Sequence, residues 1–80
     1  MFLKDAIEIR IDNLCEEKNI TINKLCIISG ITQSTLANLR ARPKMNISTL
    51  TLLRICRGLN ITLEEFFNDP LFKNNDFDDD

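Results

Sequence analysis

Apolar residues recur along the chain at the spacing of amphipathic helices. The stripe in the first segment consists of Leu3, Ile7, Ile11, Leu14 and Cys15. Side chains three and four residues apart share one face of a helix, so this stripe predicts a first helix over residues 3–18, with Ile9 outside the buried face. Long β-branched alternations of period two are missing, and an all-helical domain is therefore expected.

The next two predicted helices are short and are separated by a glycine. Thr21 and Thr32 are suitable N-caps, which predicts helices over 22–29 and 33–40. Gly30 is expected to end the second helix in the left-handed conformation, which costs glycine nothing. The apolar residues expected inside are Leu25, Cys26 and Ile28 in the second helix, Ile31 in the turn, and Leu36 and Leu39 in the third.

Two further helices complete the expected bundle. The fourth is predicted over residues 47–59 with Asn46 as its N-cap, and the fifth over 63–68 from the capping box that Thr62 forms with Glu65. The expected core positions of these helices are Leu50, Leu53, Ile55 or Cys56, Leu59, Phe66 and Phe67. The chain is thus interpreted as one all-α, five-helix domain over residues 1–70, followed by an acidic, flexible tail over 71–80.

Charge is strongly segregated along the chain. Residues 21–57 contain no acidic residue, whereas the two flanking segments carry all twelve. The basic residues of this window are Lys24, Arg40, Arg42, Lys44, Arg54 and Arg57. Such a window indicates binding to a polyanion, because each basic group near a phosphate releases condensed counterions. A merely solvated basic face is the alternative interpretation.

The histidine and cysteine content of the chain argues against an enzyme or a metal protein. The chain has no histidine and three cysteines, Cys15, Cys26 and Cys56, at positions where a helix needs a small apolar residue. Three thiols without histidine make neither a complete zinc site nor an even set of disulfides, so buried, reduced thiols in a cytoplasmic protein are expected. No catalytic residue, cofactor or metal is predicted. No apolar run is long enough for a membrane span or a signal peptide.

Residues 21–39 carry the most specific pattern. They read TINKLCIISGITQSTLANL, which resembles the Cro and phage-repressor helix-turn-helix family (XRE type), with its pattern T-x-x-x-L-A-x-x-x-G-[VI]-[ST]-x-x-[ST]-[ILV]-x-x-[ILV]. The resemblance extends over about residues 7–68. It implies a fold of the lambda-repressor type and binding of double-stranded DNA, with the third helix in the major groove.

Carried over position by position, the resemblance implies a role for individual residues. Gln33, Ser34 and Asn38 are expected to face base edges, and amide side chains suit adenine. The residues expected at the DNA backbone are Thr21, Asn23, Thr32, Thr35, Arg40, Arg42 and Lys44. Polar surface without a ligand is the alternative for the first three.

Three features of the sequence depart from the family's pattern. The usual glutamine at the start of the second helix is Ile22, so its support for the first recognition residue is expected to be lost. Many members pair an arginine late in the first helix with a glutamate late in the third, where this chain has Cys15 and Arg40. This departure predicts that the ion pair is gone and that Arg40 is free to face DNA. The usual glycine after the third helix is Arg42.

The apolar residues near the C-terminus allow three interpretations. Phe66, Phe67, Leu71 and Phe72 can close the core, form a homodimer face or bind another protein. A homodimer is expected, because one recognition helix reads only about four to six base pairs. The function expected is transcriptional regulation, by repression rather than activation. The alternative is a protein-interaction module on the same fold, binding a toxin, a peptide or another protein regulator.

Overall fold

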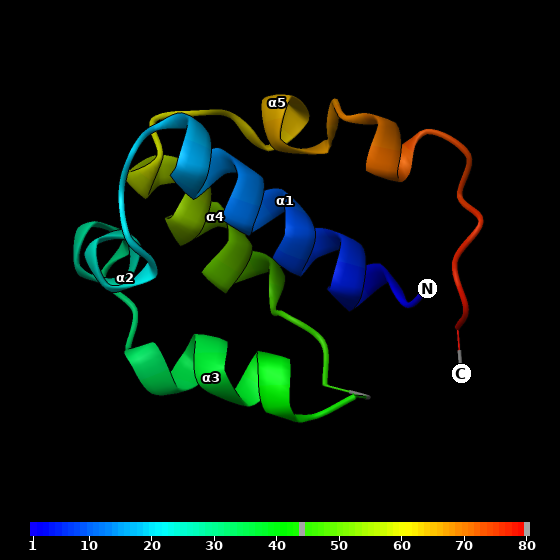
Figure 1. Cartoon of the computed structure of the whole chain (residues 1–80), viewed down its shortest axis with the longest axis horizontal. Coiled ribbons are helices and arrows are strands. Elements are labelled where there is room, and N and C mark those ends of the chain that lie inside the picture. Colours follow the sequence, from blue (N-terminus) through cyan, green and yellow to red (C-terminus); the bar gives the residue numbers. More distant parts are fainter. Residues whose placement is uncertain (44, 80) are drawn as a thin grey trace.

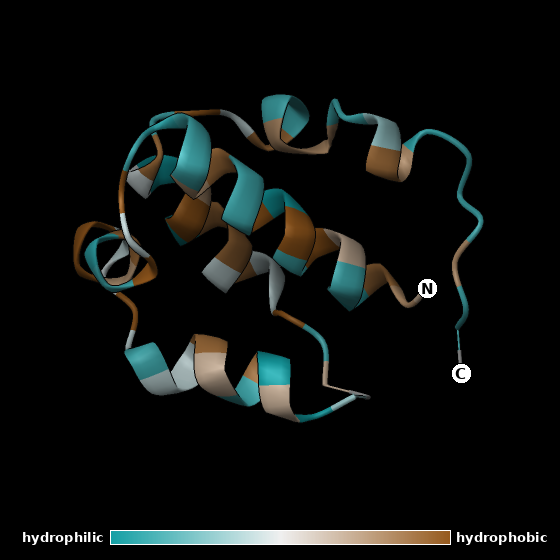
Figure 2. Ribbon diagram, in the orientation of Figure 1, coloured by the Kyte–Doolittle hydropathy of each residue, from teal (hydrophilic) through white to brown (hydrophobic). Residues whose placement is uncertain are grey.

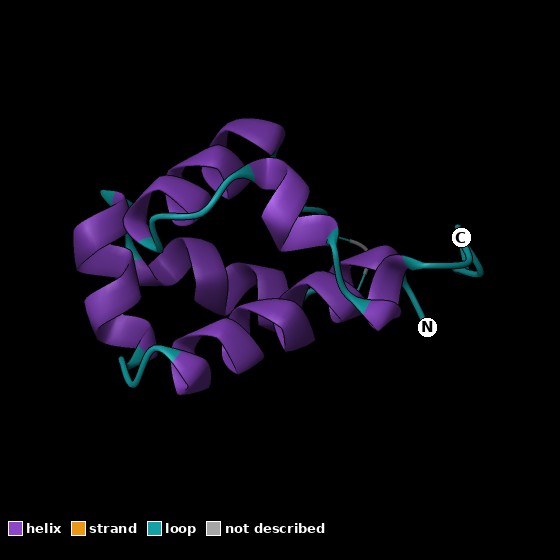
Figure 3. Cartoon of the chain, turned by 90° about the horizontal axis from the view of Figure 1, so that it is seen from above, coloured by secondary structure: helices purple, strands orange, loops and turns teal. Residues whose placement is uncertain are grey.

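The computed structural model describes residues 1–43 and 45–79 (Figure 1). The elements are α1 (Leu3–Glu17), α2 (Ile22–Ser29), α3 (Gln33–Ala41), α4 (Thr49–Gly58), α5 (Leu63–Phe67) and a 3-10 turn, η1 (Pro70–Phe72). Among these described residues the only β-type pairing is an isolated bridge between Phe2 and Asp78, and Figure 3 shows helices joined by loops. The predicted all-α, five-helix fold is confirmed.

The core draws buried side chains from all five helices. Its members are Ile7, Ile11, Leu14, Cys15, Leu25, Cys26, Leu36, Leu39, Leu52, Ile55, Cys56, Leu59 and Phe66. Apolar and polar residues alternate along the helices in Figure 2, as amphipathic helices around one core require. The core therefore forms where the apolar faces of the five helices pack against one another.

Local capping explains where the helices begin. The hydroxyls of Thr21, Thr32 and Thr62 each accept a hydrogen bond from the backbone N–H three residues on, and Thr62 and Glu65 form the predicted capping box. Gly30 has φ 70°, in the left-handed region, and ends α2 as predicted. The chain thus turns sharply between α2 and α3.

The start of the fourth helix differs from the prediction. Its N-cap is Ser48, whose hydroxyl accepts from the N–H of Thr51 at 3.0 Å, so Asn46 is not the cap and residues 47–48 stay extended. With α4 beginning at Thr49, the buried stripe runs through Leu52 and Leu50 is 53 % exposed. The choice of Leu50 as a core residue was wrong, because Leu52, Ile55, Cys56 and Leu59 form the continuous helical stripe.

Two other apolar residues of the predicted stripes face outward. Leu3 is the first residue of α1 and is exposed, whereas the next residue, Lys4, is buried. Ile28 is exposed because α2 buries Leu25, Cys26 and Ser29.

The C-terminal residues return to the start of the chain. Phe72 in η1 packs against the core, and Arg10 of α1 donates hydrogen bonds to the carbonyls of Glu65 and Phe66 and pairs with Asp69. Further on, the carboxylate of Asp78 lies 2.7 Å from the N-terminal ammonium, and both termini lie on one side in Figures 1 and 3. The flexibility expected of residues 71–80 stays a prediction, and Asp80 lies outside the described residues.

Candidate nucleic-acid interface

Helices α2 and α3 meet through a small apolar hinge. Leu25 of α2 and Leu36 and Leu39 of α3 are buried, and half-buried Ile31 packs beneath the turn. The N–H of Ile31 donates to the carbonyl of Cys26 at 3.1 Å, which closes the turn after Gly30. This hinge fixes the angle between the two helices and leaves the opposite face of α3 open.

The open face of α3 carries the predicted base-reading residues. Gln33, Ser34 and Asn38 are all exposed, and the Gln33 amide donates a hydrogen bond to the side-chain oxygen of Asn23 in α2. Residue 22 gives Gln33 no support, as expected, because Ile22 packs against the core. Asn23, which sequence analysis did not consider for this role, supports Gln33 instead.

Three hydroxyls are linked at the N-terminus of α3. The Thr32 hydroxyl lies 3.0 Å from that of Ser34 and 2.9 Å from that of Thr35, and it also caps the helix. The first N–H groups of a helix lack intrahelical partners and favour anions. The Thr21 hydroxyl likewise caps α2 by accepting from the N–H of Lys24. Both helix starts thus combine backbone donors with hydroxyl groups.

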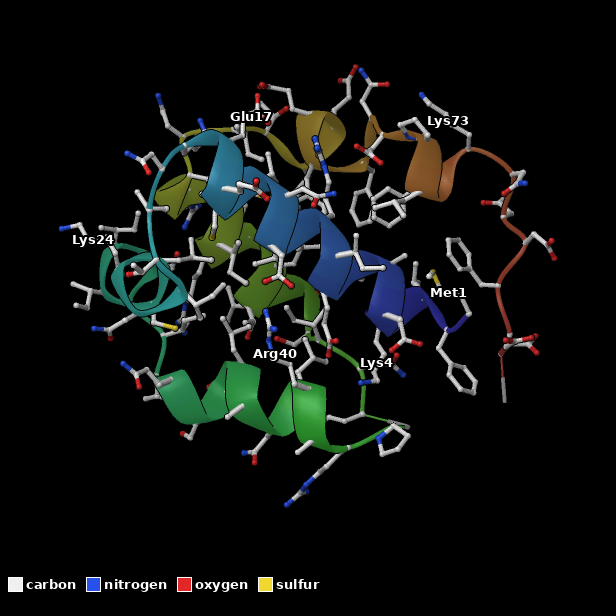
Figure 4. The ribbon with its side chains drawn as sticks, in the orientation of Figure 1. Met1, Lys4, Glu17, Lys24, Arg40 and Lys73 are labelled. Atoms are coloured by element: carbon white, nitrogen blue, oxygen red, sulfur yellow. The ribbon has the colours of Figure 1, made fainter. Side chains whose placement is uncertain are left out.

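Arg40 is not free, contrary to the prediction from the family's missing pair. Its guanidinium lies 2.6 Å from the carboxylate of Asp12 in α1. Figure 4 labels Arg40 in the space between α1 and α3, the helices labelled in Figure 1. The hydrogen bond from Arg40 to Asp12 raises the pKa of Arg40 above its ordinary value. Asp12 lies three residues before Cys15 and so reaches the same side of α1, a spacing that the sequence contains but that sequence analysis missed.

The loop after α3 keeps Arg42 exposed. The Arg42 backbone has φ −111° and ψ 108°, an extended conformation that needs no glycine, and its N–H donates to the carbonyl of Asn38 at 3.1 Å. Arg42 is therefore available at the end of the recognition surface. Lys44, the other predicted backbone contact in this loop, lies outside the described residues.

The charge segregation of the sequence divides the helices by charge. The acid-free window forms α2, α3 and α4, whereas the acidic residues belong to α1, α5 and the C-terminal segment. Asp12 is the acidic residue that reaches into this window, through Arg40.

The three cysteines lie in the core, away from this surface. Cys15, Cys26 and Cys56 are free and buried, as expected, and burial raises the pKa of each thiol. In residues 1–43 and 45–79 no group of histidine, cysteine or acidic side chains is arranged to hold a metal. Across that same part of the chain, every helix is too short or too polar to cross a membrane.

The C-terminal phenylalanines separate into two groups. Phe66 is 0 % exposed and belongs to the core, and Phe72 packs against the core from outside. Phe67 is 37 % exposed beside the exposed Leu63, and its ring meets that of Phe72 edge-on at 5.0 Å. Leu71 is half-buried. Exposed apolar area thus remains on α5 at Leu63 and Phe67, and half-buried Leu71 follows four residues later in the sequence.

Comparisons with known proteins agree with this geometry. The sequence profile of the Cro/C1-type HTH DNA-binding domain matches residues 10–70. The chain is also 35 % identical over 57 residues to an SPbeta prophage-derived uncharacterized HTH-type transcriptional regulator, YopS, of Bacillus subtilis, covering 71 % of this chain and 77 % of that protein. No solved structure matches the chain. The chain therefore belongs to the Cro/C1-type helix-turn-helix family of DNA-binding domains.

Proposed function

We propose that this protein is a sequence-specific transcriptional regulator, acting as a repressor, that reads the major groove with the N-terminal half of α3. The observation that carries the proposal is the bond from Gln33 to Asn23, which holds an amide on the exposed face of α3. An amide side chain in a fixed orientation can discriminate adenine, because its N–H donates to N7 while its oxygen accepts from the N6 amino group. Asn38 adds a second amide further along α3, and Ser34 lies beside Gln33 in the sequence.

Contacts to the DNA backbone would surround this reading surface. The two helix starts at Thr21 and Thr32 offer N–H groups to phosphates, with Thr35 beside the second. Asn23 accepts from Gln33 through its oxygen, so its N–H groups stay available as donors. Arg42 and Lys44 would contact phosphates beyond α3, whereas Arg40 would first have to leave Asp12.

We further propose that two copies bind together as a homodimer. Leu63, Phe67 and Leu71 form an apolar surface on the C-terminal part of the chain, apart from α2 and α3. A homodimer would double the length of DNA read and would bury this surface. If the same surface instead binds a foreign protein, the protein alone stays monomeric at micromolar concentration in light scattering. The free, buried thiols suit a reducing cytoplasm.

Binding to duplexes tests the reading surface. A·T-rich and scrambled duplexes are titrated with the wild type and with the Gln33→Ala/Asn38→Ala double variant. Asn13→Ala, at an exposed position of α1, is the control. The double variant should lose discrimination between A·T-rich and scrambled duplexes, and the control should keep it. Equal discrimination by the double variant would refute recognition through α3.

A charge-reversal pair tests the backbone contact. Arg42→Glu should weaken binding to all duplexes, whereas Arg57→Glu, at the last turn of α4, changes the net charge equally and should have a much smaller effect. Equal losses would show that net charge alone governs binding.

A further inference from the structure

A buried lysine links the first helix to the end of the recognition helix. Lys4 is 5 % exposed, although it lies in the first turn of α1. A buried ammonium group is tolerated only where hydrogen bonds and opposite charge replace water. Its Nζ donates to the backbone carbonyl of Leu39 at 2.7 Å and to the carboxylate of Glu8 at 3.3 Å.

The carbonyl of Leu39 is one that its own helix leaves without a partner. The last four carbonyls of a helix have no intrahelical donor, and a cation at this end is also favoured by the helix dipole. The carbonyl of Asn38 receives the N–H of Arg42, and that of Leu39 receives Lys4. The last turn of α3 is thus completed by a side chain from a distant part of the sequence.

Recognition helix α3 has little apolar contact to hold it in place. It buries two side chains, Leu36 and Leu39. Its polar ties to α1 are the bond from Lys4 and the Arg40–Asp12 ion pair, which Figure 4 shows in the space between the two helices. The ion pair is exposed and weak, whereas the Lys4 bond is buried and charge-assisted.

We propose that Lys4 is a positioning residue for DNA reading: it fixes the orientation of α3 through the Leu39 carbonyl without touching DNA. Base edges are discriminated only by side chains held within a fraction of an ångström, so a loosened α3 loses specific contacts first. Contacts to phosphates from the start of α2 do not pass through the Leu39 carbonyl. This inference rests on the proposed reading through α3.

Three variants separate positioning from charge and from stability. Lys4→Met keeps the aliphatic stem and removes the donor, Lys4→Arg keeps a cation that can donate, and Lys18→Met removes the same charge from an exposed position next to the far end of α1. If Lys4→Met does not fold, Lys4→Leu, which also lacks a donor, takes its place. All measurements are made at a temperature where each protein is fully folded by circular dichroism.

The first readout is amide hydrogen exchange without DNA. We expect α3 amides to exchange about ten-fold faster in Lys4→Met than in Lys18→Met, with α2 and α4 amides unchanged. Lys4→Arg should restore most of the protection. Unchanged exchange in α3 would overturn the proposal, whether or not the protein reads DNA as proposed.

The second readout is binding to a duplex enriched by the wild type from a random library. Lys4→Met should bind this duplex about ten-fold more weakly than the wild type does. For a scrambled duplex, its loss of affinity should be no greater than that of Lys18→Met. The salt dependence should equal that of Lys18→Met. The proposal would be overturned if Lys4→Met lost equal affinity for both duplexes and its log affinity fell less steeply with log salt, by about one phosphate contact. That result would show that Lys4 touches a phosphate directly. If the wild type enriches no duplex, sequence reading fails, and the exchange measurement alone decides the role of Lys4.

Discussion

The guanidinium of Arg40 in the recognition helix lies 2.6 Å from the carboxylate of Asp12 in α1. Resemblance to the family implies a pair between the same two helices with the opposite polarity, an arginine in the first and an acid in the third. In this chain the acid is in α1 and the arginine in α3, so the link between the helices is kept and its charges are exchanged. The exchange places a cation, not an anion, beside the proposed DNA surface.

Releasing Arg40 should therefore strengthen DNA binding. Asp12→Asn keeps the shape of the side chain and removes its charge. Because both side chains of the pair are about half exposed, the variant should lose at most about 1 kcal/mol of unfolding free energy. The slope of log affinity against log salt should steepen by about one phosphate contact, since Arg40 becomes available.

Asn13→Asp, next to Asp12 on α1, is a control that adds a charge instead of removing one. It should weaken binding slightly through repulsion. If Asp12→Asn leaves the salt slope unchanged, Arg40 does not reach DNA even when free.

Most of the fold follows from local sequence signals, and the polar links between helices do not. The caps at Thr21, Thr32 and Thr62 and the turn at Gly30 were predictable, because each depends on residues within four positions. The links from Lys4 to Leu39 and from Arg40 to Asp12 span 35 and 28 residues. A long charged side chain looks the same in sequence whether it faces water or another helix, so the Lys4 link could not be predicted. The only signal for the Arg40 link was the position of Asp12, one turn before Cys15.

The register of α4 shows a second limit of sequence patterns. Asn46 and Ser48 are both good N-caps, so the sequence allows two starts for this helix. The Ser48 hydroxyl accepts from the N–H of Thr51, which selects the later start. The cap does not decide which face is buried, because Leu52, Ile55, Cys56 and Leu59 share one face for either start.

A close approach of α2 and α4 gives a second prediction. A Cβ atom added at Gly58 would lie 2.4 Å from Oγ of Ser29, which has no hydrogen-bond partner within the described residues. Ser29→Ala should raise the unfolding free energy by about 1 kcal/mol in urea titrations, because it removes a buried unsatisfied hydroxyl.

Gly58→Ala should lower the unfolding free energy by about 1 kcal/mol, since overpacking exceeds the gain in helix propensity. Its cost should shrink in the Ser29→Ala background, where the clashing oxygen is absent. Additive effects in the double variant would contradict the proposed contact.

Burial of the thiols predicts a loss of stability in alkaline solution. The pKa of Cys15, Cys26 and Cys56 is raised from the ordinary value of 9.0, mainly by burial. Between pH 9 and the raised pKa, the unfolded chain releases thiol protons that the folded chain keeps. The stability is therefore complete below pH 9 and falls above it, by up to about 1.4 kcal/mol per pH unit for each thiol.

Urea titrations between pH 7 and 10 measure this slope. A Cys15→Ala/Cys56→Ala variant should have a lower stability at pH 7 but a shallower decline above pH 9. An unchanged decline would assign it to groups other than the thiols.

The acidic C-terminal segment lies beside the loop that follows α3. A cleft of about 470 Å³ is lined by Phe77, Asp78 and Asp79 on one side and by Pro43 and Asn46 on the other. The Asp78 carboxylate pairs with the N-terminal ammonium, whose pKa it raises, and the backbone of Asp78 forms a bridge with Phe2. The acids thus share a cleft with Pro43, the residue that follows Arg42 in the sequence.

Removing these charges should strengthen non-specific binding. In Asp76→Asn/Asp78→Asn/Asp79→Asn, affinity for random duplexes at low salt should rise several-fold, because the carboxylates no longer repel phosphates. A control of equal net charge, Glu16→Gln/Glu17→Gln/Glu64→Gln, removes exposed acids from α1 and α5 and should have a smaller effect. Equal gains would show that total charge matters and the position of the segment does not, whereas no gain in either variant would remove the segment from DNA binding altogether.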